Sequence, residues 1–171
     1  MGTRLLSLFA ALLLVAACAT NDPSTSGTGT GTGGADGNNA QAGAATGSQA
    51  APAAGSEQQF VVEVGDRVFF ETDQSTLTAE ARNTLNNQAA WLQQYGQFSI
   101  LIEGHADERG TREYNLALGE RRANAVRNYL VTRGVSANRI TTTSFGKERP
   151  EVVGSNPAAW AQNRRSVTVL R

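Results

Sequence analysis

The hydrophobic and polar positions divide the chain into three stretches of different character. An apolar run covers Leu5–Ala17, residues 18–57 carry almost no large apolar side chains, and periodic patterns occupy residues 58–171. Only the periodic part can bury enough apolar area to offset the chain entropy that is lost on folding. We therefore expect one globular domain over residues 58–171, preceded by two segments, 1–17 and 18–57, that add nothing to its core.

The periodicity within that domain predicts alternating strands and helices. Ala81, Leu85 and Ala89 recur at helical spacing, whereas Ile100 and Ile102 alternate with their neighbours as strand residues do. The order strand, helix, strand, helix, strand implies two crossover units, and so an α/β domain built as a two-layer sandwich with a further short helix and a C-terminal strand. The expected elements are strands over 60–64 and 67–70 joined by a tight turn, a helix over 78–95, a strand over 98–103, a helix over 111–133, a strand over 140–145, a short helix opened by Asn156-Pro157, and a strand over 166–170.

The first apolar run has the properties of an export signal. It follows Arg4, it is too short to span a bilayer, and it ends Val15-Ala16-Ala17-Cys18. These small residues before a cysteine resemble the lipobox of bacterial lipoproteins, in which the cysteine receives a lipid and becomes the mature N-terminus. An ordinary secretory signal with an incidental cysteine is the alternative. By the same resemblance, Ala19 after Cys18 points to the outer membrane as the destination.

The segment 18–57 consists mainly of small and polar residues, with a low-complexity run at 27–34. A segment of this composition is expected to be a disordered tether. A flexible chain of about 40 residues has a root-mean-square span of roughly 35 Å. It would therefore let the domain search for a ligand well away from a membrane anchor.

The charges of the chain argue against a nucleic-acid partner. The 15 basic residues equal the 15 acidic ones, and the net charge is zero. Lys147 is the only lysine, and the arginines are interleaved with acids such as Glu113 and Glu120. No unopposed basic stripe is left for phosphates to follow.

The most informative stretch, Gly104–Ala123, reads GHADERGTREYNLALGERRA. A Gly-rich acidic loop stands directly before a helix rich in arginine. This suits a small ligand that bears both an ammonium and a carboxylate, because Asp107 can hold the ammonium while the guanidinium of Arg122 forks onto the carboxylate. A loop and several helical turns separate the two residues, so the sequence alone does not show that they meet.

From about Val68 to its end, the chain resembles the OmpA-like peptidoglycan-binding domain family. Ala106 and Gly119 stand where the wider family commonly has Thr and Ser, and both choices favour its lipoprotein members. The fold implied is the family's βαβαβ core, in agreement with the periodicity. The shared motifs are Gly104–Thr111, Tyr114-Asn115, Leu118–Ala123, Phe145–Glu148 and Asn163–Arg165.

The resemblance implies a function that is not enzymatic and needs no cofactor. The family grips the peptide stem of peptidoglycan through meso-diaminopimelate. With lipid on Cys18, such a protein links the outer membrane to the cell wall, and its partners are peptidoglycan, TolB and other proteins of the Tol system. Position by position, five residues are implied to contact the stem: Asp107, Arg122, Asp73, Arg109 and Leu118.

Several residues also have structural interpretations. Asp107 could brace the Gly-rich loop, Leu118 could be a core residue, and Arg164 with Arg165 is expected to be structural or partner surface with no role in the pocket. His105, the only histidine, invites a metal or general-base interpretation, but it lacks further His or Cys ligands and an oriented nucleophile. The rival functions are an envelope hydrolase and a scaffold that binds proteins only.

Overall fold

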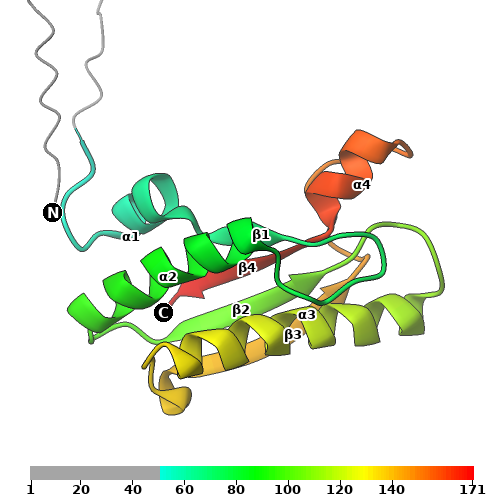
Figure 1. Ribbon diagram of the computed structural model, residues 1–171. Helices are drawn as coiled ribbons and strands as arrows, with labels where there is room; N and C mark the ends of the chain where they lie inside the picture. Colours follow the sequence, from blue (N-terminus) through cyan, green and yellow to red (C-terminus); the bar gives the residue numbers. More distant parts are fainter. Residues whose placement is uncertain (1–50) are drawn as a thin grey trace, which may run out of the picture. The chain divides into compact units, whose positions relative to one another are not determined.

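A four-stranded sheet and two long helices carry the fold of residues 51–171, the part of the chain that the computed structural model describes (Figure 1). The predicted signal, Cys18 and all but the end of the predicted tether lie outside the described residues. The strands are β1 (Arg67–Phe69), β2 (Ile100–His105), β3 (Ile140–Gly146) and β4 (Arg165–Leu170). The helices are α1 (Glu57–Gln59), η1 (Phe60–Gly65), α2 (Ala79–Gln94), α3 (Arg112–Thr132), η2 (Ala137–Arg139) and α4 (Pro157–Asn163).

The strand order in the sheet is β1-β4-β2-β3. β2 and β3 are parallel neighbours joined by α3, whereas β4 runs antiparallel to both β1 and β2. The β1–α2–β2 crossover therefore skips one position, and the C-terminal strand fills it. Both predicted crossovers are confirmed, and the last strand lies inside the sheet rather than at its edge.

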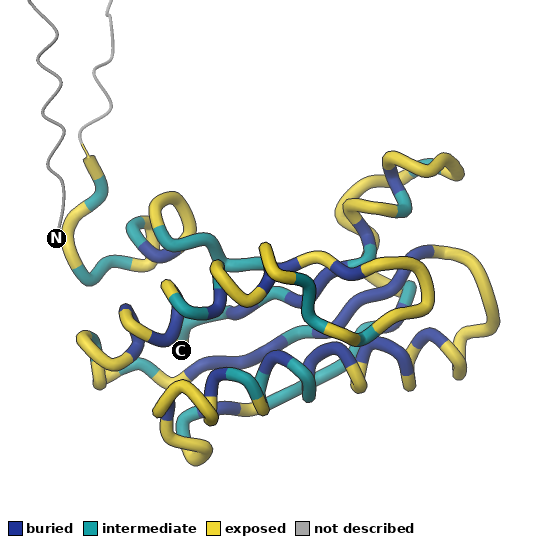
Figure 2. The backbone as a smooth tube through the Cα atoms, viewed as in Figure 1, coloured by how far each residue is buried: buried dark blue, intermediate teal, exposed yellow. Residues whose placement is uncertain are grey.

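The two long helices lie on the same side of the sheet, as the two-layer prediction requires (Figure 1). Their inward sides are buried, and their outward sides are exposed (Figure 2). The core between the layers is formed by apolar side chains from both helices, from strands β1, β2 and β3, and from η1. Its most deeply buried members are Phe60, Leu85, Leu92, Ile100, Ile102, Ala123, Val126 and Leu130.

The ends of the helices follow from local sequence. Thr78 and Thr111 precede α2 and α3, and each hydroxyl accepts a hydrogen bond from a backbone N–H three residues on, at 3.1 and 3.2 Å. Asn156 caps α4 in the same way at 2.9 Å, with Pro157 in the first helical position. Gly134 follows α3 with φ +92°, a left-handed conformation that favours glycine. These boundaries confirm the sequence predictions.

The predicted strand over residues 60–64 is wrong. Phe60–Gly65 forms a turn of π-helix, η1, directly after α1. The apolar run at 60–64 is rich in valine, as strands are, but only Phe60 is buried, with its ring centre 5.0 Å from that of Trp91. Ser56 starts the helical segment by accepting a hydrogen bond from a backbone N–H three residues on. The contact with α2 and this cap therefore override the strand pattern, and the first strand is β1.

A very close contact between α3 and β2 fixes the two elements that carry the main motif. A Cβ atom on Gly104 would overlap the backbone carbonyl of Gly119, and a Cβ atom on Gly119 would overlap the Ser144 hydroxyl. That hydroxyl donates a hydrogen bond of 2.7 Å to the carbonyl of Leu116 in α3. Only glycine at both positions lets the helix backbone lie directly on the strand, and this sets where α3 stands relative to the end of β2.

Candidate functional site

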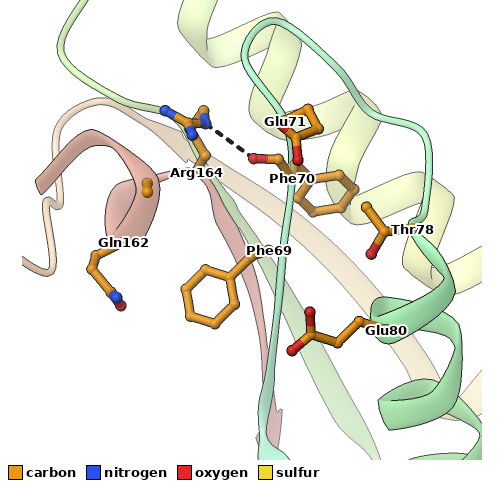
Figure 3. A pocket seen from close by; sticks show the side chains of 8 residues that line it. Phe69, Phe70, Glu71, Thr78, Glu80, Gln162 and Arg164 are labelled. Carbon is orange, nitrogen blue, oxygen red and sulfur yellow. Dashed lines mark hydrogen bonds between the residues drawn. The ribbon is translucent and has the colours of Figure 1, made fainter. Parts of the chain in front are cut away.

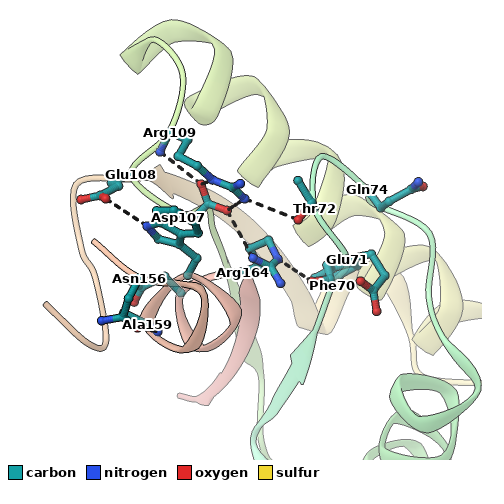
Figure 4. Close-up of polar contacts among 12 residues, drawn as sticks. Phe70, Glu71, Thr72, Gln74, Asp107, Glu108, Arg109, Asn156, Ala159 and Arg164 are labelled. Carbon is teal, nitrogen blue, oxygen red and sulfur yellow. Dashed lines mark hydrogen bonds and ion pairs between the residues drawn. The ribbon is translucent and has the colours of Figure 1, made fainter. Parts of the chain in front are cut away.

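Three segments that are distant in the sequence meet beyond the carboxyl ends of β1 and β2 (Figure 4). The loop over residues 106–111 leads from β2 to α3, the loop over 70–78 leads from β1 to α2, and Arg164 stands between α4 and β4. Hydrogen bonds join all three segments. The site is therefore assembled by the fold and not by one continuous motif.

Asp107 is the centre of an arginine cluster. One carboxylate oxygen accepts bonds from the backbone N–H and Nε of Arg109, at 3.1 and 3.0 Å, and the other accepts from Arg109 Nη2 at 2.7 Å. Arg164 Nη1 lies 3.4 Å from the second oxygen. Burial raises the pKa of Asp107, but the hydrogen bonds from Arg109 outweigh it, and the net pKa lies below its ordinary value. The group is therefore a carboxylate at neutral pH.

Arg122 is fully buried, and its guanidinium donates hydrogen bonds to backbone carbonyls rather than to a carboxylate. Its Nε donates to the carbonyl of Gln74 at 2.8 Å, its Nη1 to that of His105 at 2.8 Å, and its Nη2 to that of Glu71 at 3.1 Å. Burial lowers the pKa of Arg122 to about 10, so it remains charged at neutral pH. Arg122 thus ties the loop over 70–78 to the end of β2, and two of its five N–H groups remain beyond these bonds.

Asp107 and Arg122 lie on the same side of the fold, because Arg122 bonds to the residue two positions before Asp107. No direct ion pair links them among residues 51–171. The sequence left open whether the two residues meet; the structure brings them to the same end of the sheet without direct contact, and in different roles. Arg122 lies beneath the site and shapes it, whereas Arg109 and Arg164 are the guanidiniums that touch Asp107.

Asp73 and Arg109 border an open hollow of about 300 Å³ that is also lined by Gly110 and Tyr114. Asp73 has φ +56°, a left-handed conformation that is uncommon outside glycine, asparagine and aspartate. The Arg109 side chain is 42% exposed where it lines the hollow. Leu118 is buried, which agrees with its packing interpretation.

The sequence interpretation missed two contributions from the C-terminal part of the chain. Arg164, expected to have no role in the pocket, donates to the carbonyl of Phe70 at 3.0 Å and contacts Asp107. Trp160 in α4 lies beneath the Arg109 guanidinium, 4.4 Å from the ring centre, and donates to Glu108 at 2.9 Å. The sequence feature that could have indicated these two contributions is the closeness of Trp160 to the arginines of the Asn163–Arg165 motif.

His105 takes no part in this cluster. Its side chain lies on the sheet face opposite the helices, stacked on Phe145 with ring centres 5.6 Å apart. Within residues 51–171, no three His, Cys, Asp or Glu side chains gather closely enough to hold a metal ion. Across the same residues, no helix is both long and apolar enough to cross a membrane.

Comparisons with known proteins agree with the fold, and the matched residues include those of the candidate site. The OmpA family model matches residues 69–164, a range that includes all five predicted contact residues. The chain is 50% identical to the peptidoglycan-associated lipoprotein of Mesorhizobium japonicum over 160 residues, which cover 94% of this chain and 87% of that protein. It is 61% identical to the Brucella melitensis protein of the same name over 116 residues, 68% of this chain and 69% of that one.

A solved structure supports the same assignment. The crystal structure of the peptidoglycan-associated lipoprotein from Burkholderia pseudomallei aligns with a TM-score of 0.61 and 42% sequence identity, over 62% of this chain and 90% of that one.

Proposed function

The chain belongs to the OmpA family, and from that premise we propose that it binds peptidoglycan non-covalently, through the diaminopimelate of the stem peptide. The observation that carries the proposal is the ionised Asp107 beside the partly exposed guanidinium of Arg109, at the edge of an open hollow. The names of its relatives, peptidoglycan-associated lipoproteins, support the same ligand class.

The proposed binding mode uses opposite charges for the two ends of one small group. Diaminopimelate presents an ammonium and a carboxylate on its free end. The ammonium replaces Arg109 at the Asp107 carboxylate, and the released Arg109 turns to the ligand carboxylate. Asp73 borders the same hollow and adds negative charge near the ammonium. Arg122 keeps the loop over 70–78 in place and offers its remaining N–H groups to the carboxylate side.

Such a mode would discriminate between two common stem peptides. A lysine stem has the ammonium but lacks the carboxylate, so it would leave guanidinium donors without a partner, and unpaired groups of this kind are costly. Titration of the domain with a diaminopimelate stem peptide and with its lysine counterpart tests this. We expect at least roughly tenfold tighter binding of the former. Equal affinities would contradict the proposed ligand.

Sedimentation with purified sacculi tests the residues. We expect the wild-type chain to pellet with sacculi, and Asp107→Asn and Arg109→Ala to stay largely in solution. Glu57→Gln, a change in α1 at the other end of the domain, is the matched control and should pellet normally (Figure 1). Unchanged sedimentation of the Asp107 and Arg109 variants would rule out this site. Release of soluble fragments from the sacculi would instead favour a hydrolase.

We further propose that lipid on Cys18 anchors the protein in the outer membrane and that residues 18–57 act as the tether. Two weak attachments joined by a flexible chain hold strongly, because the second is intramolecular and sees a millimolar-scale local concentration. The protein would thus link membrane and wall while each bond still exchanges. The Cys18→Ser variant should fold normally and leave the membrane fraction; persistent membrane fractionation would contradict the anchor.

The Tol-Pal system is the proposed context, with TolB as the partner and envelope integrity and cell division as the roles. The acidic loop and arginine helix are the surface that both wall and TolB would use. Added TolB should then release the protein from sacculi in proportion to its concentration. Equal sedimentation of the complex and the free protein would show that the two surfaces do not overlap.

A further inference from the structure

The outer edge of β1 has unused backbone hydrogen-bonding groups. β1 pairs with β4 on one side, and no strand of the described part of the chain pairs with its other side. The carbonyl of Asp66 accepts a bond of 2.7 Å from Thr168 in β4, and the N–H of Phe70 donates one of 2.9 Å to the carbonyl of Arg164, directly before β4. In an antiparallel ladder, successive residues direct their N–H and C=O alternately toward the partner strand and away from it. Arg67 and Phe69 therefore present donors and acceptors to the open edge.

Hollows on both sides of Phe69 make this edge accessible as a groove. One, of about 190 Å³, extends from Val64 along β1 to the start of α2. The other, of about 210 Å³, extends from Phe69 past α4 to Arg164. Both hollows are lined by Phe69, Thr78 and Glu80, so they adjoin along the strand, and we call the two together the β1-edge groove. Figure 3 shows the ring of Phe69 standing between α4 and the carboxylate of Glu80, and Phe69 is 40% exposed.

The free charges of the β1-edge groove are negative. Its two arginines, Arg67 and Arg164, are each engaged by carboxylates of the domain itself. Glu71 and Glu80 line the groove and form no ion pair with any residue of 51–171. A cationic occupant fits this charge. The chain's own N-terminal segment does not, because it carries no Lys or Arg after Arg4.

We propose that the β1-edge groove binds a short extended segment of another polypeptide, which adds a strand beside β1. Backbone bonds to Arg67 and Phe69 would hold the segment, an apolar side chain would pack on the Phe69 ring, and a lysine or arginine would face Glu80. The groove ends at Arg164, next to the candidate wall site. Phe69 and Glu80 take no part in that site, so this inference does not rest on the proposed function.

A peptide titration tests the inference on the full mature chain, kept unlipidated by Cys18→Ser. The probes are two seven-residue peptides, acetyl-Thr-Val-Lys-Val-Lys-Val-Thr-amide and the same peptide with glutamate in place of lysine. We expect the lysine peptide to shift the amide resonances of Arg67 and Phe69 and to slow their hydrogen exchange. The glutamate peptide should bind roughly tenfold more weakly, because it meets Glu71 and Glu80 with like charge.

A pair of variants at one position separates backbone pairing from side-chain packing. Phe69→Pro removes the outward N–H without taking a bond from the β4 ladder, whereas Phe69→Ala removes only the ring. We expect Phe69→Pro to abolish peptide binding and Phe69→Ala to weaken it several-fold. Glu80→Gln should weaken the lysine peptide roughly threefold and leave the fold unchanged, so it decides the matter if the proline variant unfolds.

The outcomes against the inference are distinct. Peptide shifts confined to other surfaces, equal binding of both peptides, or full binding to Phe69→Pro would overturn it. Self-association of the wild-type chain that Phe69→Pro abolishes would show that a second copy occupies the groove, and would overturn it as well. All three groove variants should still sediment with sacculi, so failure of the wall proposal and failure of this one remain distinguishable.

Discussion

The two faces of the sheet are stabilised by different forces. The face under α2 and α3 is almost entirely apolar, and its strand residues Ile100 and Ile102 are fully buried. One buried polar pair on this face is satisfied, because the Thr168 hydroxyl donates to the Gln88 side chain at 3.0 Å, whereas the buried Ser166 hydroxyl of the same strand has no partner within the described residues. Gln88 in turn donates to the carbonyl of Gly65. Hydrophobic burial therefore dominates on this side.

The opposite face buries charged and titratable groups without satisfying all of them. His105 is only 2% exposed, and neither ring nitrogen has a hydrogen-bond partner within the described residues. Arg165 is 5% exposed, and it pairs with Glu151 at 3.2 Å through only one of its nitrogens. Arg149 covers this layer, with its guanidinium 3.8 Å from the Phe145 ring centre. We therefore expect the stability that this face contributes to depend on pH and salt more than that of the helix face.

On the helix face, the contact of α3 with β2 should be the place where a substitution lowers stability most. Gly104→Ala places a methyl group on the backbone carbonyl of Gly119, which cannot move without shifting the helix. We expect a loss of more than about 4 kcal/mol of unfolding free energy, or no folded protein. The measurement is urea denaturation followed by circular dichroism. Gly96→Ala is the matched control, because nothing lies within 4 Å of its added Cβ; near-normal stability of Gly104→Ala would contradict the close contact.

Cavity formation in the apolar layer should be the next largest effect. Leu92 is fully buried between α2 and the sheet, so Leu92→Ala should cost about 2–5 kcal/mol. The same loss is expected at pH 5 and pH 7, because no titratable group is involved. Val153→Ala, at a position that is 91% exposed, should change stability by less than about 0.5 kcal/mol. A strong pH dependence of the Leu92→Ala loss would break the distinction between the faces.

How far the sequence predicts this molecule depends on the range of the interactions concerned. The helices α2 and α3 and the cap of α4 at Asn156 were predicted correctly, because periodicity and capping are local. The strand over 60–64 was wrong because a short apolar run fits either element, and the contact between Phe60 and Trp91 decides between them. The position of β4 inside the sheet depends on long-range pairing that no local pattern encodes.

The site shows the same limit. Asp107 and Arg109 are two positions apart, so the acidic loop could be recognised directly. Arg164 lies 57 positions after Asp107, and only the fold brings it there. The partners of Arg122 are backbone carbonyls on a loop about 50 positions earlier. Since every residue has such a carbonyl, these contacts leave no mark on the sequence.

The pH dependence expected of the sheet face opposite the helices, the outer face, comes from His105, the only histidine. Burial, together with the nearby charge of Arg165, lowers the pKa of His105 from 6.5 to about 4, while Glu151 opposes this shift. Between these values the unfolded chain binds the proton and the folded domain does not. Stability should therefore fall as the pH drops below 6.5, by about 2 kcal/mol from pH 7 to pH 5.

Urea unfolding at several pH values measures this slope. His105→Phe keeps an aromatic ring on Phe145 and removes the titration, so its stability should vary much less over the same range. Asp107 titrates below its ordinary pKa and does not contribute between pH 5 and pH 7. An equal slope in wild type and His105→Phe would mean that the buried imidazole is not the source.

The smallest effect expected is that of the exposed ion pair at the margin of the outer face. Arg67 and Glu151 are 3.0 Å apart, with side chains 34% and 43% exposed. A double-mutant cycle with Arg67→Ala and Glu151→Ala should give a coupling of less than about 1 kcal/mol. The cycle is needed because Arg67 also pairs with Asp66 and Glu151 with Arg165. The coupling should vanish in 1 M salt, where the screening length is about 3 Å. A larger coupling that resists salt would mean that this pair is shielded from solvent as His105 is. The buried charges of the outer face would then extend to the edge of the sheet.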